Sequence, residues 1–384
     1  MADSGPMPES RRVIFLRSNP IDPDTRVEKS AGALVDAGYR VSVLGWDRSG
    51  KLEETSQLGE VNIIRLGIKA AYGTGLRNLP ALLRWQWGCF RWLIQHKGEY
   101  DIIHACDFDT LFPALILKLI WNKTVVYDIF DFYADHLRST PGWIKRLVRS
   151  VETNCIRWVD GLILVDDARW EQVGGAKPKK LAVVYNSPKD VSQQLLKENG
   201  KSKDSHFTLV YVGLMQVERG IREILEVMSR HPDWRLDLAG FGGDEALIHE
   251  LAEKMENVRW HGRIAYSRAL ELSAKADALF ATYDPKIPNH RYASPNKVFE
   301  AMMLGMPIVV ARDTNVDKTV DKHNCGLVVD YGDVDQLEAA LINLSESPEL
   351  RSWLGENARQ VYESDYSWGE MESRLFSLYA SLSS

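Results

Sequence analysis

The stretch SPNKVFEAMMLGMPIVVA, residues 294–311, is the most informative part of the sequence because it predicts a helix followed directly by a buried strand. Pro295 fits the first turn of that helix, since proline fixes φ and lacks an N–H that the first turn leaves unpaired in any case. Gly305 is expected to end the helix, because glycine readily takes the left-handed conformation found there. The apolar run IVVA then predicts a strand covered on both faces, as in a parallel sheet.

The same alternation of apolar runs and helical segments extends over both halves of the chain. Runs rich in β-branched residues, such as VIFLR from Val13, TVVYDI from Thr124 and TLVYVG from Thr208, are mostly separated by stretches of helical periodicity. This pattern predicts buried parallel strands joined by crossover helices, with ligands bound beyond the carboxyl ends of the strands. Residues 189–206 are polar, and we interpret them as a linker between two α/β domains.

Size and composition agree with a soluble protein of two domains. The chain has 384 residues, of which 45% are hydrophobic and 26% charged, as is ordinary for globular proteins. The four cysteines are far apart, which favours free thiols in a reducing compartment over disulfides or a zinc site. The first dozen residues lack an apolar core and no charge-free run of spanning length occurs. We therefore expect no signal peptide, no membrane span and a cytoplasmic location.

Two glycine-containing turns are candidates for phosphate binding. In LVYVGLMQVERGIREIL a strand passes through Gly213 and a helix opens near Arg219, so backbone N–H groups and a guanidinium can face a diphosphate. In LDLAGFGGDEALIHEL, Gly240 and Gly242 stand between a strand and a helix, where they can line a nucleotide cleft. The alternatives are an ordinary strand–loop–helix with a surface arginine, and a plain tight turn.

Lys297 and Glu300 give the most specific prediction of a binding site. They are three residues apart at the start of a helix and therefore share a face. Lys297 and the helix N-terminus, with Ser294, Pro295 and Asn296, form a candidate anion pocket. Glu300 can accept hydrogen bonds from both hydroxyls of a ribose. The alternative is a surface ion pair worth a few tenths of a kcal/mol.

The segment SPNKVFEAMMLGMPIVV resembles the nucleotide-sugar segment of the family 4 glycosyltransferases. Other stretches are similar to motifs of that family in the same order: YDIIHACDFDTLFPA, VVYNSP, YVGLMQVERGI, AKADALFAT and the tail YSWGEMESRLFSLYASL. The resemblance implies an α/β fold of the GT-B kind, in which two Rossmann-like parallel-sheet domains face a cleft and a C-terminal helix crosses back to the first domain. The expected parts are an acceptor-binding domain over 1–190, a nucleotide-sugar-binding domain over 207–365 and the returning helix over 366–384.

Three positions depart from the usual pattern of that family. Tyr292 stands where the family has the first Glu of its EX7E motif, Leu214 stands where it usually has Arg, and Phe130 lies near the place of its His. These departures resemble a subgroup with PxK in place of the first Glu. In that subgroup Lys297 would share the diphosphate with Arg219.

The resemblance also implies a retaining reaction in which the leaving diphosphate itself helps to deprotonate the acceptor. The main task of the protein is then to stabilise charge on that diphosphate. The catalytic candidates are Asp131, Arg219 and Lys297. Asp24 is a further candidate for a sugar hydroxyl, and Arg26 for the diphosphate across the cleft. The expected donor-binding residues are Gly213, Arg219, Gly240, Gly242, Ile264, Ser294, Pro295, Asn296, Lys297 and Glu300.

Asp107 and Asp109 form a DxD pattern, which binds metal in a different glycosyltransferase fold. A carboxylate pair at this spacing is common by chance, and here it follows a strand of the acceptor-side domain. We interpret it as a helix start with Asp109 as N-cap, and we expect no metal requirement and no bound cofactor. His104, at the end of the same strand, is interpreted as a hydrogen-bonded buried histidine in preference to a base.

Two stretches of the slightly basic N-terminal half suit an anionic membrane surface. Residues 76–97 combine arginines and tryptophans at heptad spacing, and residues 140–158 repeat this style. The alternative is that the tryptophans cover the sheet, as crossover helices require. The basic excess is too small to argue for nucleic acid. The spaced residues are Arg77, Arg84, Arg91, Trp85 and Trp92.

The leading hypothesis is a glycosyltransferase that moves a sugar from a nucleoside diphosphate sugar onto a glycan or lipid-linked glycan at the cytoplasmic face of a membrane. A UDP-sugar is favoured as donor and a GDP-sugar is possible. One alternative is a non-catalytic GT-B subunit that binds a glycan or a partner glycosyltransferase, because the family's His and first Glu are missing. A third possibility is a nucleotide-sugar epimerase of the same architecture, which would convert the donor without an acceptor.

Overall fold

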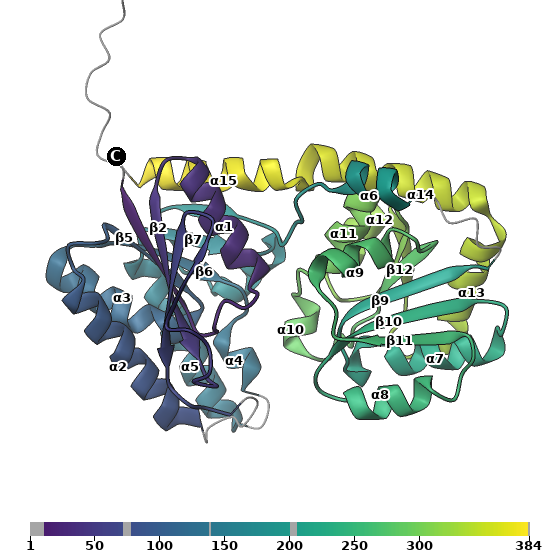
Figure 1. Cartoon of the computed structure of the whole chain (residues 1–384), viewed down its shortest axis with the longest axis horizontal. Helices are drawn as coiled ribbons and strands as arrows, with labels where there is room; N and C mark the ends of the chain where they lie inside the picture. Colours follow the sequence, from purple (N-terminus) through teal and green to yellow (C-terminus); the bar gives the residue numbers. More distant parts are fainter. Residues whose placement is uncertain (1–10, 72–77, 138–139, 200–205, 383–384) are drawn as a thin grey trace, which may run out of the picture. The chain divides into compact units, whose positions relative to one another are not determined.

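The chain folds into two compact α/β units (Figure 1). The computed structural model describes residues 11–71, 78–137, 140–199 and 206–382. Unit 1 comprises the residues up to Val184 and those from Glu372 onward, and unit 2 runs from Tyr185 to Met371. Part of the expected linker, Ser192–Asn199, is instead a helix, α6. It begins there because the Asp190 carboxylate accepts hydrogen bonds from the backbone N–H and the hydroxyl of Ser192.

Unit 1 is built on an eight-stranded sheet of order β3-β4-β2-β1-β5-β6-β7-β8. All neighbouring strands are parallel except β3, which pairs with β4 in antiparallel fashion. The strands are β1 Arg12–Arg17, β2 Arg40–Asp47, β3 Thr55–Leu58, β4 Val61–Gly67, β5 Ile102–Cys106, β6 Thr124–Ile129, β7 Gly161–Leu164 and β8 Leu181–Val183. The α-helices are α1 Thr25–Asp36, α2 Leu79–Gln95, α3 Phe108–Trp121, α4 Tyr133–His136 and α5 Gly142–Cys155.

Unit 2 is built on a six-stranded parallel sheet of order β11-β10-β9-β12-β13-β14. The parallel α/β pattern predicted for both halves is confirmed. The strands are β9 Thr208–Leu214, β10 Arg235–Phe241, β11 Val258–Gly262, β12 Ala278–Ala281, β13 Ile308–Ala311 and β14 Gly326–Val329. Besides α6, the α-helices are α7 Ile221–Arg230, α8 Glu245–Ala252, α9 Tyr266–Ser273, α10 Pro288–Arg291, α11 Asn296–Leu304, α12 Val316–Lys322, α13 Val334–Glu346 and α14 Pro348–Val361.

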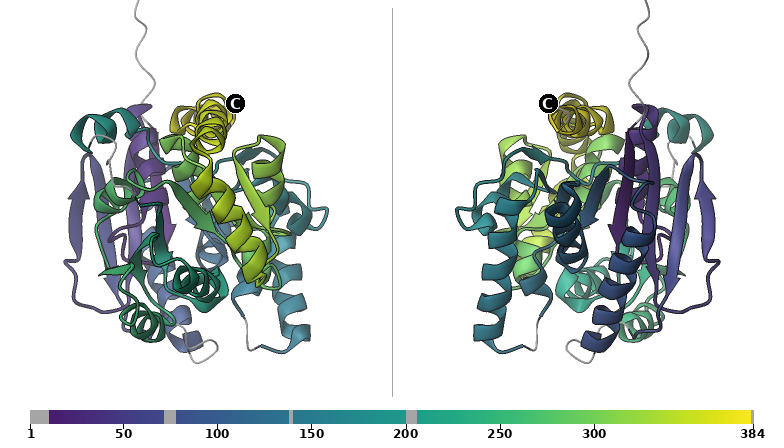
Figure 2. Two further views of the ribbon diagram at one scale, coloured as in Figure 1. Left: turned by 90° about the vertical axis from the view of Figure 1, so that its right-hand side faces the viewer. Right: turned by 90° about the vertical axis from the view of Figure 1, so that its left-hand side faces the viewer.

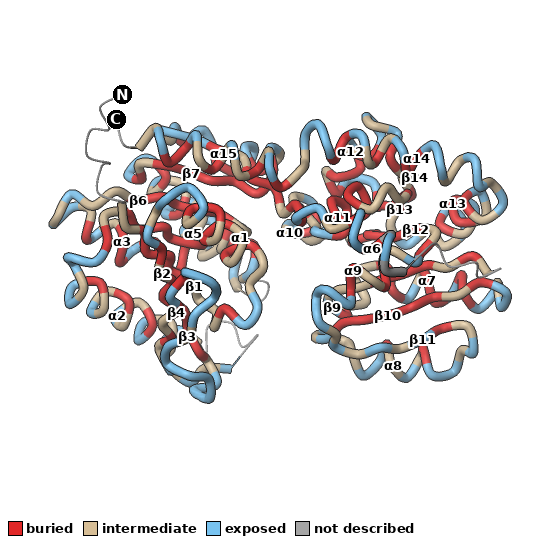
Figure 3. Tube along the Cα trace, turned by 45° about the horizontal axis from the view of Figure 1, so that its top comes forward, coloured by how far each residue is buried: buried red, intermediate tan, exposed pale blue. Residues whose placement is uncertain are grey.

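The strands form the cores of both units because they are apolar on both faces. Every residue of β7 is buried, as are the five central residues of β10, and Figure 3 shows both strands almost entirely in the buried colour. In unit 1 the Trp46 ring stacks on the Trp85 ring with 5.4 Å between the centroids. Trp85 is fully buried, so its expected place at a membrane surface is wrong. It belongs to the core because the sheet face of α2 must be apolar.

The segment 294–311 folds as its sequence predicts, with one shift. α11 begins at Asn296, and Pro295 is its N-cap residue instead of a member of the first turn. Gly305 ends the helix at φ 65, as predicted, and its backbone N–H donates to the carbonyl oxygens of Ala301 and Met302. β13 follows directly and is wholly buried.

The last helix, α15 (Trp368–Ser381), contributes to both units. It appears from the side in Figure 1 and nearly end-on in Figure 2. Within unit 1, the Tyr379 hydroxyl lies 2.7 Å from His104 Nδ1 and Arg374 donates to the Val183 carbonyl. The expected return of a C-terminal helix to the first domain is confirmed. No helix within the described ranges is long and apolar enough to cross a bilayer.

Gly355 allows α14 to approach the end of α11 closely. A Cβ at Gly355 would lie 2.3 Å from the carbonyl oxygen of Gly305, whereas a Cβ at Gly32 in α1 would meet nothing within 4 Å. We predict that Gly355→Ala lowers the free energy of unfolding of unit 2 by about 1–3 kcal/mol through overpacking. Gly32→Ala should raise that of unit 1 by about 0.5–1 kcal/mol, because alanine is the better helix former. Denaturant unfolding of both variants measures this, and a stabilising Gly355→Ala would contradict the close approach.

Candidate functional site

The predicted donor-binding residues gather where the strand order of unit 2 reverses. From β9 the chain adds β10 and β11 on one side of the sheet, and then β12, β13 and β14 on the other. In open α/β sheets the crevice for a ligand lies at such a switch point, beyond the carboxyl ends of the strands. Gly213 and Arg219 follow the core of β9 at this point, and Lys297 is presented by α11, which follows β12.

Two paired glycines bring the loops of β9 and β10 into close contact with the lysine. Gly213 and Gly240 are direct partners in the sheet, with φ values of 157 and 149. A Cβ at Gly213 would lie 2.7 Å from Lys297 Nζ, and a Cβ at Gly240 would lie 1.7 Å from the Gly213 carbonyl oxygen. Position 240 therefore requires glycine, because backbone blocks its Cβ, whereas a side chain at Gly213 would displace the lysine ammonium, which packs directly on the backbone of the turn.

Lys297 and Arg219 form a pair of cations held by two tyrosines. Lys297 Nζ donates to the Tyr283 hydroxyl at 3.2 Å and lies 4.2 Å from the centroid of the Tyr211 ring. The Arg219 guanidinium lies 4.7 Å from the centroid of the Tyr283 ring, and its Nε donates to the Gln216 side-chain oxygen at 3.1 Å. Within the described chain neither cation forms an ion pair with a carboxylate.

These cations change the electrostatics of the tyrosine between them. Burial by itself raises the pKa of Tyr283, but the charges of Lys297 and Arg219 outweigh burial and hold that pKa below its ordinary value. Lys297 is only 7% exposed, so its charge has little solvent to satisfy it. An uncompensated, largely buried positive charge at the carboxyl edge of a sheet favours an anionic ligand.

A serine hydroxyl with no hydrogen-bond partner in the described chain lies just before the N-terminus of α11, three residues before Lys297 in the sequence. Ser294 is buried, and its Oγ has no hydrogen-bond partner among the described residues. Its carbonyl oxygen accepts a hydrogen bond from the Asn186 side chain at 3.0 Å, which fixes the entry to the helix. Asn296 is exposed at the first helical position. Buried polar atoms usually have partners, so the free Oγ is available for a ligand.

Glu300 is buried one turn along α11 from Lys297. Its Oε1 accepts a hydrogen bond from the Tyr266 hydroxyl of α9 at 3.0 Å. Burial, followed by the Glu300 charge, raises the pKa of Tyr266 far above its ordinary value, so the phenol remains a donor. Because Lys297 and Glu300 are 7% and 6% exposed, the alternative of a surface ion pair is wrong.

In the glycine loop after β10, a side chain of the protein already accepts a hydrogen bond from the backbone. Gly242 has φ 100, and its N–H donates to the Glu245 carboxylate at 3.1 Å. That carboxylate therefore holds a place near the N-terminus of α8 that a phosphate oxygen could otherwise take. Ile264, which follows β11, is half-buried.

Two of the predicted residues in unit 1, Arg26 and Asp24, form hydrogen bonds and ion pairs with other residues of that unit. Arg26 is buried and ion-paired with Asp128 at 2.8 Å, and it also donates to the Val184 carbonyl at 2.7 Å. Asp24 is the N-cap of α1, where it accepts from the Val27 N–H and pairs with Arg17 at 2.9 Å. The predicted roles of Arg26 at a diphosphate and of Asp24 at a sugar hydroxyl are not supported, because these partners already satisfy both side chains.

Asp131 keeps a partly open carboxylate at the end of β6. It forms ion pairs with Arg169 and, at 3.6 Å, with His136, and its side chain is 35% exposed. Burial raises its pKa, but the Arg169 and His136 charges outweigh burial and hold the pKa below its ordinary value. Phe130 lies beside it, with the Arg17 guanidinium 4.1 Å from its ring centroid. An ionised carboxylate is thus maintained at the strand ends of unit 1.

The DxD pattern starts a helix, but with the other aspartate as N-cap. α3 begins at Phe108 with Asp107 as its N-cap, so Asp109 lies inside the first turn and the prediction of Asp109 as N-cap is wrong. Asp107 Oδ1 accepts from the Phe130 N–H at 2.9 Å. Burial and the nearby Asp107 charge raise the pKa of Asp109 to about 6. Among the described residues, no group of three or more potential metal ligands occurs.

His104 has the buried, hydrogen-bonded setting predicted from its sequence position. It is fully buried, with Nδ1 2.7 Å from the Tyr379 hydroxyl and Nε2 3.4 Å from Asp128. Its ring stacks on Phe15 at 4.0 Å, and burial lowers its pKa. These contacts serve packing and leave no nitrogen free to act as a base.

Two family models match consecutive parts of the chain. The glycosyl transferases group 1 model matches residues 192–361, and a glycosyl transferase 4-like domain model matches residues 23–187. A D-inositol 3-phosphate glycosyltransferase of Corynebacterium kroppenstedtii is 26% identical over 392 residues, covering 95% of this chain and 84% of that protein. A GDP-mannose-dependent monoacylated alpha-(1-6)-phosphatidylinositol monomannoside mannosyltransferase of Corynebacterium glutamicum is 29% identical over 163 residues, covering 42% of each chain.

Solved structures with the same architecture confirm the GT-B fold. Sucrose-phosphate synthase from Thermosynechococcus elongatus gives a TM-score of 0.79 at 18% identity, covering 97% of this chain and 99% of that chain. Anabaena HepE in complex with UDP and glucose gives 0.71 at 15% identity, covering 96% and 99%. The glycosyltransferase WaaG, which is involved in lipopolysaccharide biosynthesis, gives 0.67 at 18% identity, covering 95% and 99%.

The glycine pair allows a test of the predicted site geometry. We predict that Gly240→Ala lowers the free energy of unfolding of unit 2 by about 3 kcal/mol or more, because its Cβ would collide with backbone. Gly242→Ala should cost only about 1–2 kcal/mol of left-handed strain, since its nearest neighbour is a side-chain carbon at 3.4 Å. Denaturant unfolding compares the two, and equal losses would argue against the Gly213–Gly240 contact.

Proposed function

This chain belongs to the glycosyltransferases, and we propose that it moves a sugar from a nucleoside diphosphate sugar onto a glycan or lipid-linked glycan with retention of anomeric configuration. The observation that carries the proposal is the pair Lys297 and Arg219. Lys297 is buried and Arg219 is half-buried at the switch point of unit 2, and neither has a carboxylate partner in the described chain. The non-catalytic alternative is not favoured, because relatives matched over most of the chain are named as transferases.

The two cations suit the chemistry of a departing diphosphate. When the bond from the anomeric carbon to the phosphate oxygen breaks, negative charge develops on the diphosphate, and fixed positive groups lower the barrier. We propose that Lys297 and Arg219 supply this charge and that the reaction needs no metal. Tyr211 and Tyr283 position the lysine, and the unpartnered Ser294 hydroxyl donates to a phosphate oxygen.

The rest of the donor is assigned to neighbouring groups. We assign the ribose hydroxyls to Glu300, whose position Tyr266 fixes, and the nucleoside to the turns that contain Gly240, Gly242 and Ile264. Asn296 and Pro295 place the N-terminus of α11 toward the phosphates. A structure of HepE contains UDP, and one relative is named as GDP-mannose-dependent. Either base therefore remains a candidate, and we favour UDP.

We assign donor binding to unit 2 and acceptor binding to unit 1. The strand ends of unit 1 carry an ionised carboxylate, Asp131, which can accept a hydrogen bond from a sugar hydroxyl. Polysaccharide and glycolipid enzymes are among the matched proteins. A glycan or lipid-linked glycan made at the cytoplasmic face of a membrane is therefore the proposed acceptor.

Unit 1 also presents a surface suited to an anionic membrane, formed by α2, α3 and α5. All three helices pack against one buried cluster, and α2 and α3 also contact each other (Figures 1 and 2). α2 has no acidic residue. The predicted Arg84 and Arg91 are exposed, whereas Arg77 lies outside the described residues. The exposed apolar side chains are Leu79, Leu83, Trp87, Ile94, Phe112, Ile116, Leu119, Ile120, Trp143, Leu147 and Val151.

Donor binding is tested with Lys297→Met. Removing this charge should weaken UDP-glucose or GDP-mannose binding about 10- to 100-fold, the worth of one charge-assisted hydrogen bond. Lys286→Met is the matched control, because Lys286 is exposed on the preceding loop. Isothermal titration calorimetry gives both affinities. Unchanged binding in Lys297→Met would remove the lysine from the site, and no binding of either nucleotide sugar by the native chain would refute the proposed donor.

Membrane contact is tested by flotation with vesicles that contain phosphatidylglycerol. We predict that the native chain floats with them and that Arg84→Glu with Arg91→Glu reduces the bound fraction severalfold, since each basic residue near an anionic surface contributes about 1 kcal/mol. The control pair is Arg259→Glu with Arg268→Glu, which changes two exposed arginines of unit 2 equally. Equal flotation of both double variants would place the membrane contact elsewhere or eliminate it.

A further inference from the structure

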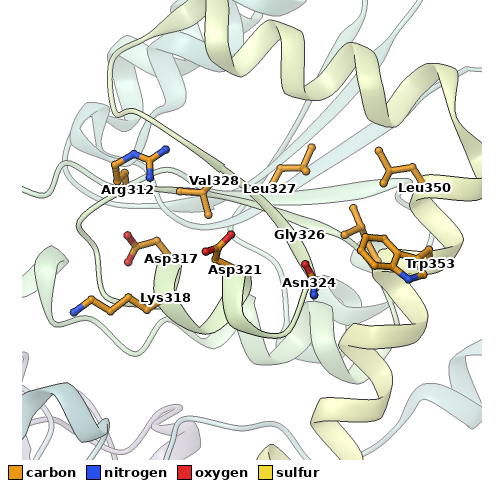
Figure 4. A pocket seen from close by; sticks show the side chains of 11 residues that line it. Arg312, Asp317, Lys318, Asp321, Asn324, Gly326, Leu327, Val328, Leu350 and Trp353 are labelled. Atoms are coloured by element: carbon orange, nitrogen blue, oxygen red, sulfur yellow. The ribbon is translucent and has the colours of Figure 1, made fainter.

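A cavity of unit 2 lies away from the donor-binding residues. It has a volume of about 370 Å³ and runs along β14, between α12 and α14 (Figure 4). β14 is the last strand in the sheet order, and β13 separates it from β12 and the switch point. The volume falls in the range of small-molecule sites in proteins. This cavity therefore needs an explanation of its own.

The cavity contains a carboxylate that is built into the fold but not fully satisfied. Asp317 is 9% exposed, and its Oδ2 accepts a hydrogen bond from the Asp313 N–H at 2.9 Å. Its Oδ1 is buried and has no hydrogen-bond partner in the described chain. A buried acceptor without a donor costs about 1–3 kcal/mol. A ligand that brings a hydroxyl or N–H group into the cavity would remove this cost.

The lining of the cavity carries charges of both signs, which favours a neutral ligand with several hydroxyl groups over a simple ion. Asp317 and Asp321 on α12 lie in it together with Lys318 of the same helix and Arg312 after β13. Arg312 is already held by Asp330 at 2.8 Å. A phosphate would meet two carboxylates, and a divalent cation would find only two carboxylates in the lining. Hydroxyl groups can both donate to the aspartates and accept from the lysine.

The opposite end of the cavity is an aromatic surface. Figure 4 shows Trp353 at the far end from Asp317, next to Leu350. Trp353 is half exposed, although it is a large apolar side chain on a helix that otherwise packs well. A ligand that fills this cavity must therefore offer polar groups to one end and an apolar face to the other. A sugar ring has both, because its hydroxyls point outward around a C–H face that packs on indole.

We propose that this cavity binds a short neutral oligosaccharide, with hydroxyls on Asp317 and Asp321 and one ring face on Trp353. The site goes beyond the proposed transfer reaction. It would hold a part of a glycan that is remote from the sugar being transferred, so that a long acceptor or product stays associated between encounters. Such tethering raises the effective concentration of the glycan without any new contact at the reacting atoms.

The experiment uses the full chain and saturation-transfer NMR with maltotriose, cellotriose and mannotriose. At least one trisaccharide should bind, and Trp353→Ala and Asp317→Asn should each weaken it about tenfold or more, while UDP-glucose and GDP-mannose affinities stay unchanged. Trp170→Ala is the matched control, because Trp170 in unit 1 is 47% exposed and Trp353 is 50% exposed. Thermal melting of each variant establishes that it is folded.

The outcomes distinguish this site from the donor site. Loss of trisaccharide binding in the two cavity variants, with nucleotide-sugar binding retained, supports the proposal. It is overturned if no trisaccharide binds at millimolar concentration, or if both variants bind as the native chain does. It is also overturned if a capped pentapeptide of alternating Thr and Val binds there instead, since that would assign the edge of β14 to strand addition. Failure of nucleotide-sugar binding alone concerns the proposed function and leaves this site standing.

Discussion

The arrangement of unit 2 depends on a lysine that is buried without a carboxylate. Removing an ammonium from water is costly unless other groups replace the solvent. Here the Tyr283 hydroxyl, the face of the Tyr211 ring and the Gly213 backbone do so. That arrangement requires glycine at two paired strand positions and an α11 that starts close to the turn after β9. The positive charge of Lys297 still lacks an anionic partner among the described residues, and a ligand can supply one. The packing of the domain is thereby linked to its chemistry.

Much of this organisation could be predicted from sequence because it depends on short-range patterns. Apolar runs between helical segments are sufficient to predict two parallel-sheet units. Gly305 predicts the end of α11 because glycine readily takes the left-handed conformation that follows a helix. The grouping of Gly213, Arg219 and Lys297 followed from strand-end positions and from a family resemblance. Neither source depends on knowing which side chains meet.

The errors concern side chains whose role is set by distant partners. The roles of Tyr211 and Tyr283 are not predicted from the sequence, although the position of Tyr283 two residues after β12 is a signal that it lies at a strand end. The sequence predicts Arg26 as a candidate for the diphosphate, but Asp128, 102 residues away in the chain, forms an ion pair with it. Trp85 has the heptad spacing of a surface stripe, yet Trp46 places it in the core. Periodicity identifies a helix face but does not tell which face meets the sheet.

The helix α15 has a consequence for how the chain is made. Its residues from Glu372 onward belong to unit 1, whose strands are all encoded before Val184. A ribosome therefore completes unit 2 before the last part of unit 1 has emerged. Until then Tyr379 cannot reach His104, and the face of the sheet that α15 covers stays bare. The first unit to be synthesised is thus the last to be finished, and its sheet stays incompletely covered while the chain is being translated.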